Sequence, residues 1–366
     1  KHWCNQPSAE FFLIYSLPKL INLYKNTSFF KYFRSMNSKK KILIAPLDWG
    51  LGHATRCIPI AKALIANNYK VIFGCDGRPL KLLKKEFPDN DFIKLTGYNI
   101  KYPKNGNMTW SMIWQSFKIL KRIKTENKAL KTLIKDFKIS GIISDNRYGL
   151  FHQDIPSVFI THQLNIQSNY FKNTIQNINF RFIKKFDECW VADSEINRLS
   201  ANLSSVKNTN FPIKYTGLLS RFKKLSKTEE IEILAIVSGP EPQRTLFENL
   251  LFKQLKESNR KATLVLGKPE FNETQQHGNL KLVSHLNAKS LNQEMSNAKI
   301  VISRSGYSTI MDLASLNKKA IFIPTPGQTE QIYLAAHFEK KKIAFAEHQH
   351  NFNIEKAIKK MPQYSG

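Results

Sequence analysis

The chain has 366 residues, 42% of them hydrophobic and 23% charged, a composition that fits an ordinary soluble globule. This length exceeds what one hydrophobic core usually serves, so we expect two domains. The 56 Lys and Arg against 28 Asp and Glu leave a net charge of +28. The excess indicates anionic partners (phosphate-bearing ligands, an acidic membrane or nucleic acid), although lysines spread over solvated faces by biased codon usage explain it equally well.

The cysteines give no sign of a disulfide framework or a metal site. Cys4, Cys57, Cys75 and Cys189 form no C-x-x-C pair and no metal-ligand spacing. We therefore expect reduced thiols in a cytoplasmic protein.

Residues 1–38 form an N-terminal extension. Its apolar stretch at 11–17 is too short to span a bilayer, and no small-residue cleavage site follows it. The extension is either an aromatic, basic surface segment or material upstream of a native start at Met36, and the second interpretation is favoured.

Short apolar runs alternate with amphipathic segments from Lys41 onward. We expect strands at 41–46, 71–75, 91–95, 141–145, 157–161 and 188–193, and, after a polar break, at 232–239, 262–268, 280–286, 299–306 and 319–327. Continuous apolar runs joined by helices are typical of parallel strands that are buried on both faces. The sequence therefore predicts an α/β fold of two doubly wound, Rossmann-like domains that face a cleft. The predicted boundaries are 39–217 for the first domain, 218–229 for a linker and 230–366 for the second domain.

The first loop that carries chemistry contains Gly50, Gly52 and His53. The glycines let the backbone turn sharply and approach a ligand, and the helix N-terminus that follows favours an anion. A dinucleotide fingerprint would have a third glycine where Thr55 stands, so NAD binding, with Asp76 on the ribose, is a weak alternative. His53 is placed at the mouth of the predicted cleft, where it either takes a proton from a hydroxyl or merely bonds the helix backbone.

Two further loops of the first half follow apolar strands and should line the same cleft. Asp145 could orient His53 or share its proton, and Arg147 could meet an acceptor phosphate. His162 and Gln163 could bind acceptor hydroxyls. For each of these residues a purely structural loop role is an equal alternative.

The second half carries loops suited to phosphate. Ser238 and Gly239 follow a strand and precede a helix, so they could touch a phosphate or form a plain turn. At 303–309, hydroxyls, a glycine and a helix N-terminus converge, as pyrophosphate binding requires. Asp312 could accept hydrogen bonds from ribose or be a solvated acid, and the loop at 324–331 adds an acid and amides suited to sugar hydroxyls.

These loops together resemble the GT-B glycosyltransferases of family 28, which include the enzyme that adds N-acetylglucosamine to the lipid-linked peptidoglycan precursor. The similarity extends from about residue 41 to residue 338, and its specific part is the stretch SRSGYSTIMDLASLNKKAIFIPTPGQTEQ. The resemblance implies a diphosphate site at Ser305 and Gly306, a ribose ligand at Asp312, donor-sugar ligands at Glu330 and Gln331, and an acceptor-side loop at Gly50, Gly52 and His53. The loop DWGLGH lacks the doubled glycine that precedes the histidine in the peptidoglycan enzyme, which leaves the acceptor open.

Three groups of site residues follow. The catalytic candidates are His53 and Asp145. The donor-binding candidates are Ser238, Gly239, Ser303, Arg304, Ser305, Gly306, Tyr307, Ser308, Asp312, Gln328, Glu330 and Gln331. The acceptor-side candidates are Gly50, Gly52, Asn146, Arg147, His162 and Gln163.

The predicted activity is an inverting, metal-independent transfer of a hexosyl group without a cofactor. The donor is expected to be a UDP-sugar, with UDP-N-acetylhexosamine favoured, and the acceptor a hydroxyl of a lipid-linked or cell-envelope saccharide. Two alternatives remain open: a nucleotide-sugar epimerase on the same fold, and a non-catalytic basic protein that binds lipid or nucleic acid. The localised polar loops argue against the second alternative, so no nucleic-acid partner is expected.

One predicted helical face is both apolar and basic. It carries Trp110, Ile113, Trp114, Phe117 and Leu120, surrounded by Lys118, Lys121, Arg122 and Lys124. Packing on the chain's own sheet is the first interpretation, and docking on an anionic membrane is the second. A peripheral location on the inner face of the plasma membrane is therefore a prediction.

Overall fold

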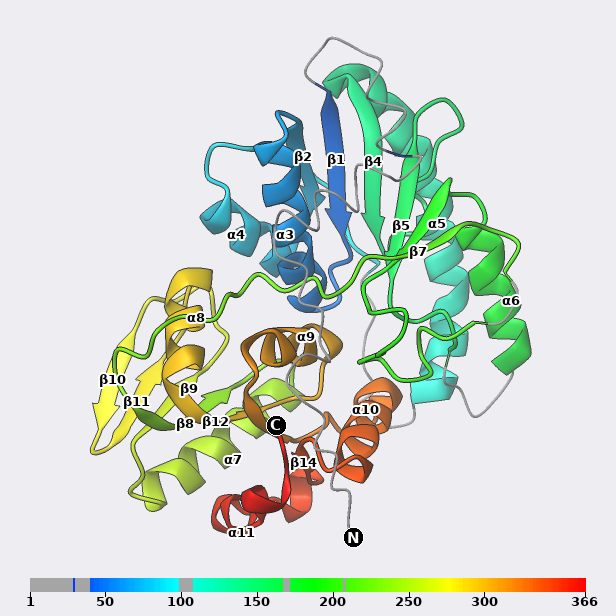
Figure 1. Cartoon of the computed structure of the whole chain (residues 1–366). Coiled ribbons are helices and arrows are strands. Elements are labelled where there is room, and N and C mark those ends of the chain that lie inside the picture. Colours follow the sequence, from blue (N-terminus) through cyan, green and yellow to red (C-terminus); the bar gives the residue numbers. More distant parts are fainter. Residues whose placement is uncertain (1–28, 30–39, 99–107, 167–171, 207–208) are drawn as a thin grey trace, which may run out of the picture.

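The computed structural model describes Phe29 and residues 40–98, 108–166, 172–206 and 209–366, with the side chains of 108–117 left aside. These residues form two α/β units, each built on one sheet, stacked one above the other in Figure 1. Two sheets in which parallel pairing dominates confirm the predicted fold class.

The first sheet has seven strands in the order β3-β2-β1-β4-β5-β6-β7, and every neighbouring pair is parallel. Its strands are β1 (Lys41–Pro46), β2 (Lys70–Cys75), β3 (Asp91–Lys94), β4 (Ile139–Asp145), β5 (Ser157–Thr161), β6 (Glu188–Val191) and β7 (Ile213–Tyr215). The helices are α3 (Gly52–Ala66), α4 (Gly77–Glu86), α5 (Met108–Phe137) and α6 (Lys172–Ile183). Every residue of β5 is buried, as its continuous apolar run predicts.

The second sheet also has seven strands, in the order β10-β11-β9-β8-β12-β13-β14. Its strands are β8 (Ile231–Ile236), β9 (Ala262–Val265), β10 (Thr274–His277), β11 (Leu280–Val283), β12 (Ala298–Ser303), β13 (Lys319–Phe322) and β14 (Phe345–Ala346). The helices are α7 (Gln243–Glu257), α8 (Ala288–Asn297), α9 (Tyr307–Leu316), α10 (Thr329–Lys340) and α11 (Ile354–Lys360). The β10–β11 pair is antiparallel and the other pairs are parallel. The sequence did not predict β7, β10 and β14, because they are short or polar.

The strand order reverses once in each sheet, and the reversals position the site. The chain moves outward from β1 to β2 and β3, then returns to place β4 on the other side of β1. The second sheet repeats this pattern at β8 and β12. Loops at the carboxyl ends of such adjacent strands diverge and leave room for a ligand. Both reversals therefore fall at the loops that the sequence marks as chemical.

The segment that joins the two sheets is only partly a polar linker. Leu218, Leu219 and Phe222 are buried in the main hydrophobic core, whereas the residues from 223 to 230 are exposed. The first part of the joining segment thus packs between the domains.

Phe29 bears on the N-terminal extension. Its ring is 1% exposed and meets Trp190 edge to face, with ring centroids 5.8 Å apart. Phe29 thus fills part of the core, and the interpretation of the first 35 residues as material upstream of a native start stays a prediction. The rest of that segment lies outside the described residues. Across the described part of the chain, no helix has both the length and the apolar character that crossing a membrane requires.

Candidate active site

The N-termini of α3 and α9, from different domains, meet at the centre of the molecule. Gly50 has a φ of +86°, which glycine adopts without strain, and α3 begins two residues later at Gly52. The Ser308 hydroxyl donates to the Gly52 carbonyl at 2.9 Å. A Cβ atom on Gly52 would lie 3.0 Å from that hydroxyl oxygen, so the small residue permits this approach. In the described structure neither helix start has a side-chain cap, so both present free backbone amides of the kind that bind anions.

His53 and Asp145 form a hydrogen-bonded pair. The His53 Nδ1 atom lies 2.7 Å from Asp145 Oδ1. Asp145 ends β4 and is fully buried, whereas the His53 side chain is 13% exposed. A carboxylate only accepts hydrogen bonds, so Nδ1 carries the hydrogen and Nε2 keeps a lone pair for a proton. The structure thus brings together the two residues that the sequence names as the catalytic pair.

Arg56, which the sequence analysis missed, completes this cluster. It lies one turn after His53 and is 2% exposed. Its Nε donates to Asp145 Oδ2 at 2.5 Å, and its Nη2 donates to Asp145 Oδ1. Burial alone would raise the pKa of Asp145, but the positive charges of Arg56 and His53 hold that pKa at about 2.

The pKa of His53 is lowered from its ordinary value. Burial is the largest cause, Asp145 opposes it, and Arg56 and His162 add to it. The imidazole is therefore neutral at physiological pH, as a proton acceptor must be.

His162 and Gln163 contact the second domain directly. His162 Nε2 lies 2.9 Å from Glu330 Oε1, and the Gln163 amide donates to the other carboxylate oxygen of Glu330. The His162 ring stacks on Tyr307, with centroids 4.3 Å apart, and the Tyr307 hydroxyl donates to the Ala192 carbonyl at 2.7 Å. The predicted acceptor-side and donor-side groups thus meet one another across the domain interface.

Ser305 and the side-chain amides of Gln328 and Gln331 form hydrogen bonds within the predicted donor loops. Ser305 donates to the Gln331 carbonyl at 2.8 Å. The Gln331 side chain accepts from the Thr325 amide at 2.8 Å and donates to Gln328 at 2.5 Å. Gly306 immediately precedes α9 and has no side chain that could cap the first backbone amides of that helix. Ligand binding by these residues stays a prediction.

Three strand ends of the second sheet carry further polar groups. Ser303 ends β12 and is paired in register with β8 on one side and β13 on the other. The hydroxyls of Ser303 and Thr325 are buried, and in the described residues they have no hydrogen-bond partner. Ser238 is exposed after β8, and Gly239 beside it has a φ of +111°. Both lie where the sequence places a phosphate loop.

Asp312 is buried against the joining segment. Its carboxylate accepts from the Ser220 hydroxyl at 2.7 Å, and burial raises its pKa to about 6, although Arg221 opposes that rise. The Arg221 atoms Nε and Nη1 are buried without a hydrogen-bond partner among the described residues. Arg221 is a second residue that the sequence analysis missed, because its segment reads as a linker.

Two predicted ligands are structural residues instead. Arg147 is 1% exposed, donates to Glu126 at 2.6 Å and to the Thr96 carbonyl at 2.8 Å, and so cannot meet an acceptor phosphate. Its neighbour Asn146 adopts a φ of +56° at the turn.

Arg304 is likewise 1% exposed. It donates to the carbonyls of Ile323, Pro324 and Gln243 and lies 3.9 Å from the centre of the Phe247 ring. Both arginines follow strands, but their guanidinium groups donate to buried acceptors of their own domains. The Nε atom of Arg304 is left without a hydrogen-bond partner among the described residues.

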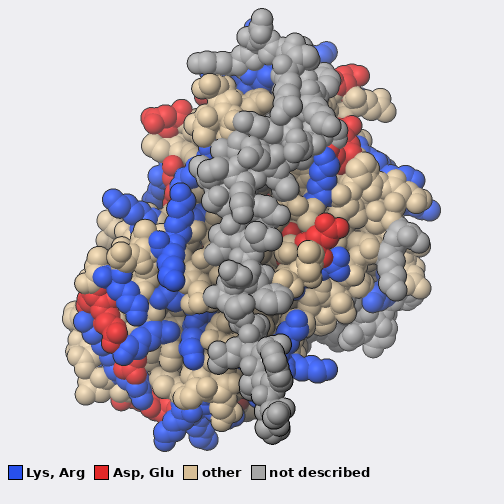
Figure 2. All heavy atoms as spheres, in the orientation of Figure 1, with Lys and Arg blue, Asp and Glu red and all other residues tan. Residues whose placement is uncertain are grey.

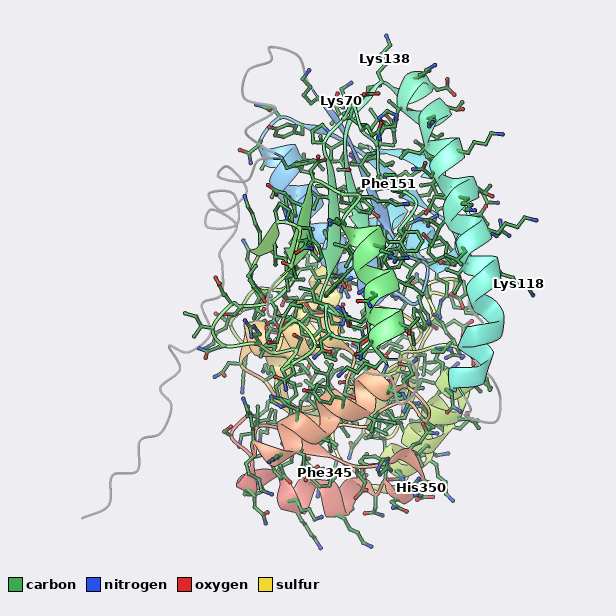
Figure 3. All side chains as sticks on the ribbon, turned by 90° about the vertical axis from the view of Figure 1, so that its right-hand side faces the viewer. Lys70, Lys118, Lys138, Phe151, Phe345 and His350 are labelled. Carbon is green, nitrogen blue, oxygen red and sulfur yellow. The ribbon has the colours of Figure 1, made fainter. Side chains whose placement is uncertain are left out.

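The structure describes only part of the predicted basic helical face on α5. The apolar members of the face up to Phe117 lie outside the described side chains, and Leu120 is 39% exposed. Figure 3 shows α5 along the outer side of the first domain, with Lys118 pointing away from it. Figure 2 shows Lys and Arg spread over one face of both domains, with acidic groups among them. No group of three or more potential metal-binding side chains occurs in the described residues.

Both halves of the chain match models of glycosyltransferase families. Residues 40–182 match the family described as Glycosyl transferase family 1, and residues 235–364 match the Glycosyltransferase family 28 C-terminal domain. An uncharacterized glycosyltransferase of Methanosarcina mazei is 26% identical over 336 residues, covering 82% of this chain and 84% of the relative. A second one, from Methanosarcina acetivorans, is 25% identical over 332 residues, with the same coverage.

Solved structures support the same fold. The calicheamicin glycosyltransferase CalG4 aligns with a TM-score of 0.61 at 10% identity, over 89% of this chain and 90% of that one. UGT2 of Phytolacca americana, solved with UDP-2fluoro-glucose and pterostilbene, aligns with a TM-score of 0.58 at 14% identity, over 89% and 90%. The chain is therefore a transferase, and specifically a glycosyltransferase, with the GT-B fold. Its second half carries the family 28 C-terminal domain, as the resemblance of the donor loops predicted.

Proposed function

We propose that the chain transfers a hexosyl group from a UDP-sugar to an acceptor hydroxyl with inversion at the anomeric carbon. The acceptor hydroxyl gives its proton to His53 Nε2 while its oxygen forms a bond to the anomeric carbon. The bond from that carbon to the diphosphate oxygen breaks, and its electron pair leaves with UDP. The observation that carries this proposal is the His53–Asp145 pair, 2.7 Å apart, at the start of α3.

The donor side would hold the diphosphate without a metal ion. The uncapped start of α9 supplies backbone amides, and Arg221 supplies a cation with two buried, unpaired N–H groups. Asp312 lies beside Arg221. Its carboxylate would accept hydrogen bonds from the ribose hydroxyls in place of the one that it now accepts from Ser220. Charge compensation by protein groups supports a metal-independent reaction that EDTA leaves unchanged.

Glu330 would bind the donor sugar. Its carboxylate lies at the start of α10 and its side chain is 29% exposed. His162 and Gln163 now occupy both of its oxygens, so sugar hydroxyls would exchange with these two side chains. An N-acetylhexosamine is the donor sugar that the family 28 resemblance favours.

The acceptor proposed here is a lipid-linked or cell-envelope saccharide reached at a membrane surface. The net charge of +28 and the exposed basic residues of α5 support attraction to anionic lipid. Co-sedimentation with vesicles of phosphatidylglycerol, compared with neutral phosphatidylcholine vesicles, tests this part separately from catalysis.

Calorimetric titration with UDP, GDP, dTDP and NAD tests the donor proposal. We expect UDP to bind preferentially, and Asp312→Ala and Ser305→Ala to weaken that binding, with Lys224→Ala on the exposed linker as the control. Binding of NAD alone, or equal weak binding of all four compounds, would contradict the proposal. Product analysis with the donor alone then separates transfer from epimerisation, because only an epimerase converts a UDP-sugar without an acceptor into another UDP-sugar.

A further inference from the structure

We propose that Arg56 is a positioning residue that holds the His53–Asp145 pair in its proton-accepting form and fixes the ring tautomer of His162. The proposal deepens the function proposed above and rests on it, because His53 is there the base. Arg56 touches no expected substrate position and acts only through the three side chains that it contacts.

The geometry places one guanidinium between both histidines and the carboxylate. Two of the Arg56 nitrogens bind the two oxygens of Asp145, and Nη1 lies 2.8 Å from His162 Nδ1. Nη2 lies 2.9 Å from His53 Nδ1. Because the Arg56 side chain is 1% exposed, these contacts are made out of reach of bulk water.

The contacts impose opposite tautomers on the two histidines. A guanidinium only donates hydrogen bonds, so His162 Nδ1 must accept from Arg56. His162 then carries its hydrogen on Nε2 and donates it to Glu330, 2.9 Å away in the second domain. At His53 the 2.7 Å contact to Asp145 requires the hydrogen on Nδ1, and the Nη2 hydrogen goes to Asp145. One side chain thus leaves Nε2 of His53 free and aims Nε2–H of His162 at the donor domain.

The charge of Arg56 matters as much as its geometry. The charged and titratable groups that face His53 are Asp145 on β4, Arg56 on its own helix, His162 after β5, and Glu330 on α10. Cys57, also on α3, faces Asp145. Burial lowers the pKa of His53, Asp145 raises it, and Arg56 lowers it. Without Arg56, the carboxylate would face the imidazole alone and stabilise the protonated ring, which cannot accept a proton.

Arg147 provides a matched control. It is also 1% exposed, belongs to the same domain and is paired with a buried carboxylate, Glu126. Among the described residues its side chain donates to Glu126 and to the carbonyls of Leu95 and Thr96, and it forms no hydrogen bond or ion pair with His53 or His162. Loss of either arginine removes the positive partner of a buried acid, so a general effect on stability is common to both variants. An effect on the histidines is expected of Arg56 alone.

The test is a pH titration of the histidine rings by NMR, using ¹³C- and ¹⁵N-labelled histidine in the full chain. Signals of His53 and His162 are assigned from His53→Gln and His162→Gln. In Arg56→Met we expect the His53 midpoint to move to higher pH and the ring ¹⁵N pattern of His162 to lose its single tautomer. Arg56→Lys keeps the charge, so the His53 midpoint should stay near that of the wild type while the His162 pattern changes. Arg147→Met should change neither signal.

Unchanged His53 and His162 signals in Arg56→Met would overturn the proposal, as would an equal change in Arg147→Met. If Arg56→Met fails to fold by circular dichroism, an unchanged His162 pattern in Arg56→Lys overturns it instead. The readout needs no substrate, so it is independent of the proposed transfer reaction. Where transfer is measurable, kcat/KM of Arg56→Met at pH 6 should fall about tenfold further below its value at pH 8 than in the wild type.

Discussion

The two sides of the site use different chemistry. On the first domain, Asp145 and Arg56 are almost completely buried charges that bind one another and a histidine. On the donor side, the loop at 303–309 offers hydroxyls and the start of α9. Arg221 of the joining segment, beside Asp312 on that helix, is a cation with unpaired donors. Fixed opposite charges suit a group that moves a proton, whereas open amides and hydroxyls suit a group that holds an anion. The comparison teaches that a substitution on the first side should lower kcat and one on the second side should raise KM.

The largest expected effect sharpens the first half of this comparison. His53→Ala removes the proton acceptor, so kcat should fall about a thousandfold while UDP binding is unchanged. Steady-state kinetics and calorimetry measure the two quantities. His277→Ala, on the edge strand β10 of the second sheet, is the matched control and should leave both unchanged. Equal loss of kcat in both variants would show that His53 has no special part.

Asp145→Asn tests whether the buried charge matters beyond folding. The amide no longer stabilises the charge that develops on His53, so kcat should fall about a hundredfold. It also leaves Arg56 without its counter-charge, at a cost of about 3 kcal/mol in the free energy of unfolding. Glu126→Gln breaks the other buried pair, with Arg147, and should lose similar stability in urea denaturation without losing kcat. An equal loss of kcat in Glu126→Gln would show that the loss in Asp145→Asn comes from reduced stability and not from the charge at the site.

Arg221→Met sharpens the second half of the comparison. Loss of a charge-assisted contact to the diphosphate should raise the donor KM about tenfold, with little change in kcat. Lys224→Met changes an exposed cation in the same segment and should leave KM unchanged. A fall in kcat at constant KM would contradict a role in donor binding and would assign Arg221 to the chemical step.

A pH dependence of similar size is expected on the donor side. Burial raises the pKa of Asp312 to about 6. Ribose hydroxyls bind the carboxylate more strongly than the acid, so UDP affinity should fall about tenfold between pH 7 and pH 5. Asp312→Asn should abolish this slope in a calorimetric titration, and persistence of the slope would exclude Asp312 as its source.

The raised pKa of Asp312 also predicts how the stability of the fold changes with pH. A raised pKa means that the native state binds the proton more tightly than the unfolded chain does. The stability that Asp312 contributes is therefore present below pH 3.8 and is lost as the pH rises through about 6. Chemical denaturation of wild type and Asp312→Asn across this range measures the difference.

Local sequence signals were enough for most of the strands and for naming two residues that the structure brings together, His53 and Asp145. Continuous apolar runs predict β1, β4, β8 and β12, so Asp145 could be named at the end of β4 and His53 at the start of the helix that follows β1. Arg56 could not be named, because an arginine near the start of a helix is usually a solvated residue. Its partners Asp145 and His162 are 89 and 106 residues away in the sequence.

The opposite error concerns Arg147 and Arg304. Both follow strands, and a strand end predicts a ligand position but not the direction of a long side chain. The partner of Arg147 is Glu126 on the preceding helix, and Arg304 reaches carbonyls at 243, 323 and 324. Only tertiary packing reveals that these guanidinium groups already bind acceptors within their own domains. Arg221 illustrates the reverse case, since a basic stretch between domains hides one side chain that turns inward.

The most direct test of the central claim is the stereochemistry of slow donor hydrolysis, in which water replaces the acceptor. Proton NMR in the first minutes of incubation with an α-linked UDP-sugar should show the β anomer of the released sugar, and His53→Ala should abolish its formation. Early appearance of the α anomer, or an unchanged rate in His53→Ala, would contradict direct displacement with His53 as the base.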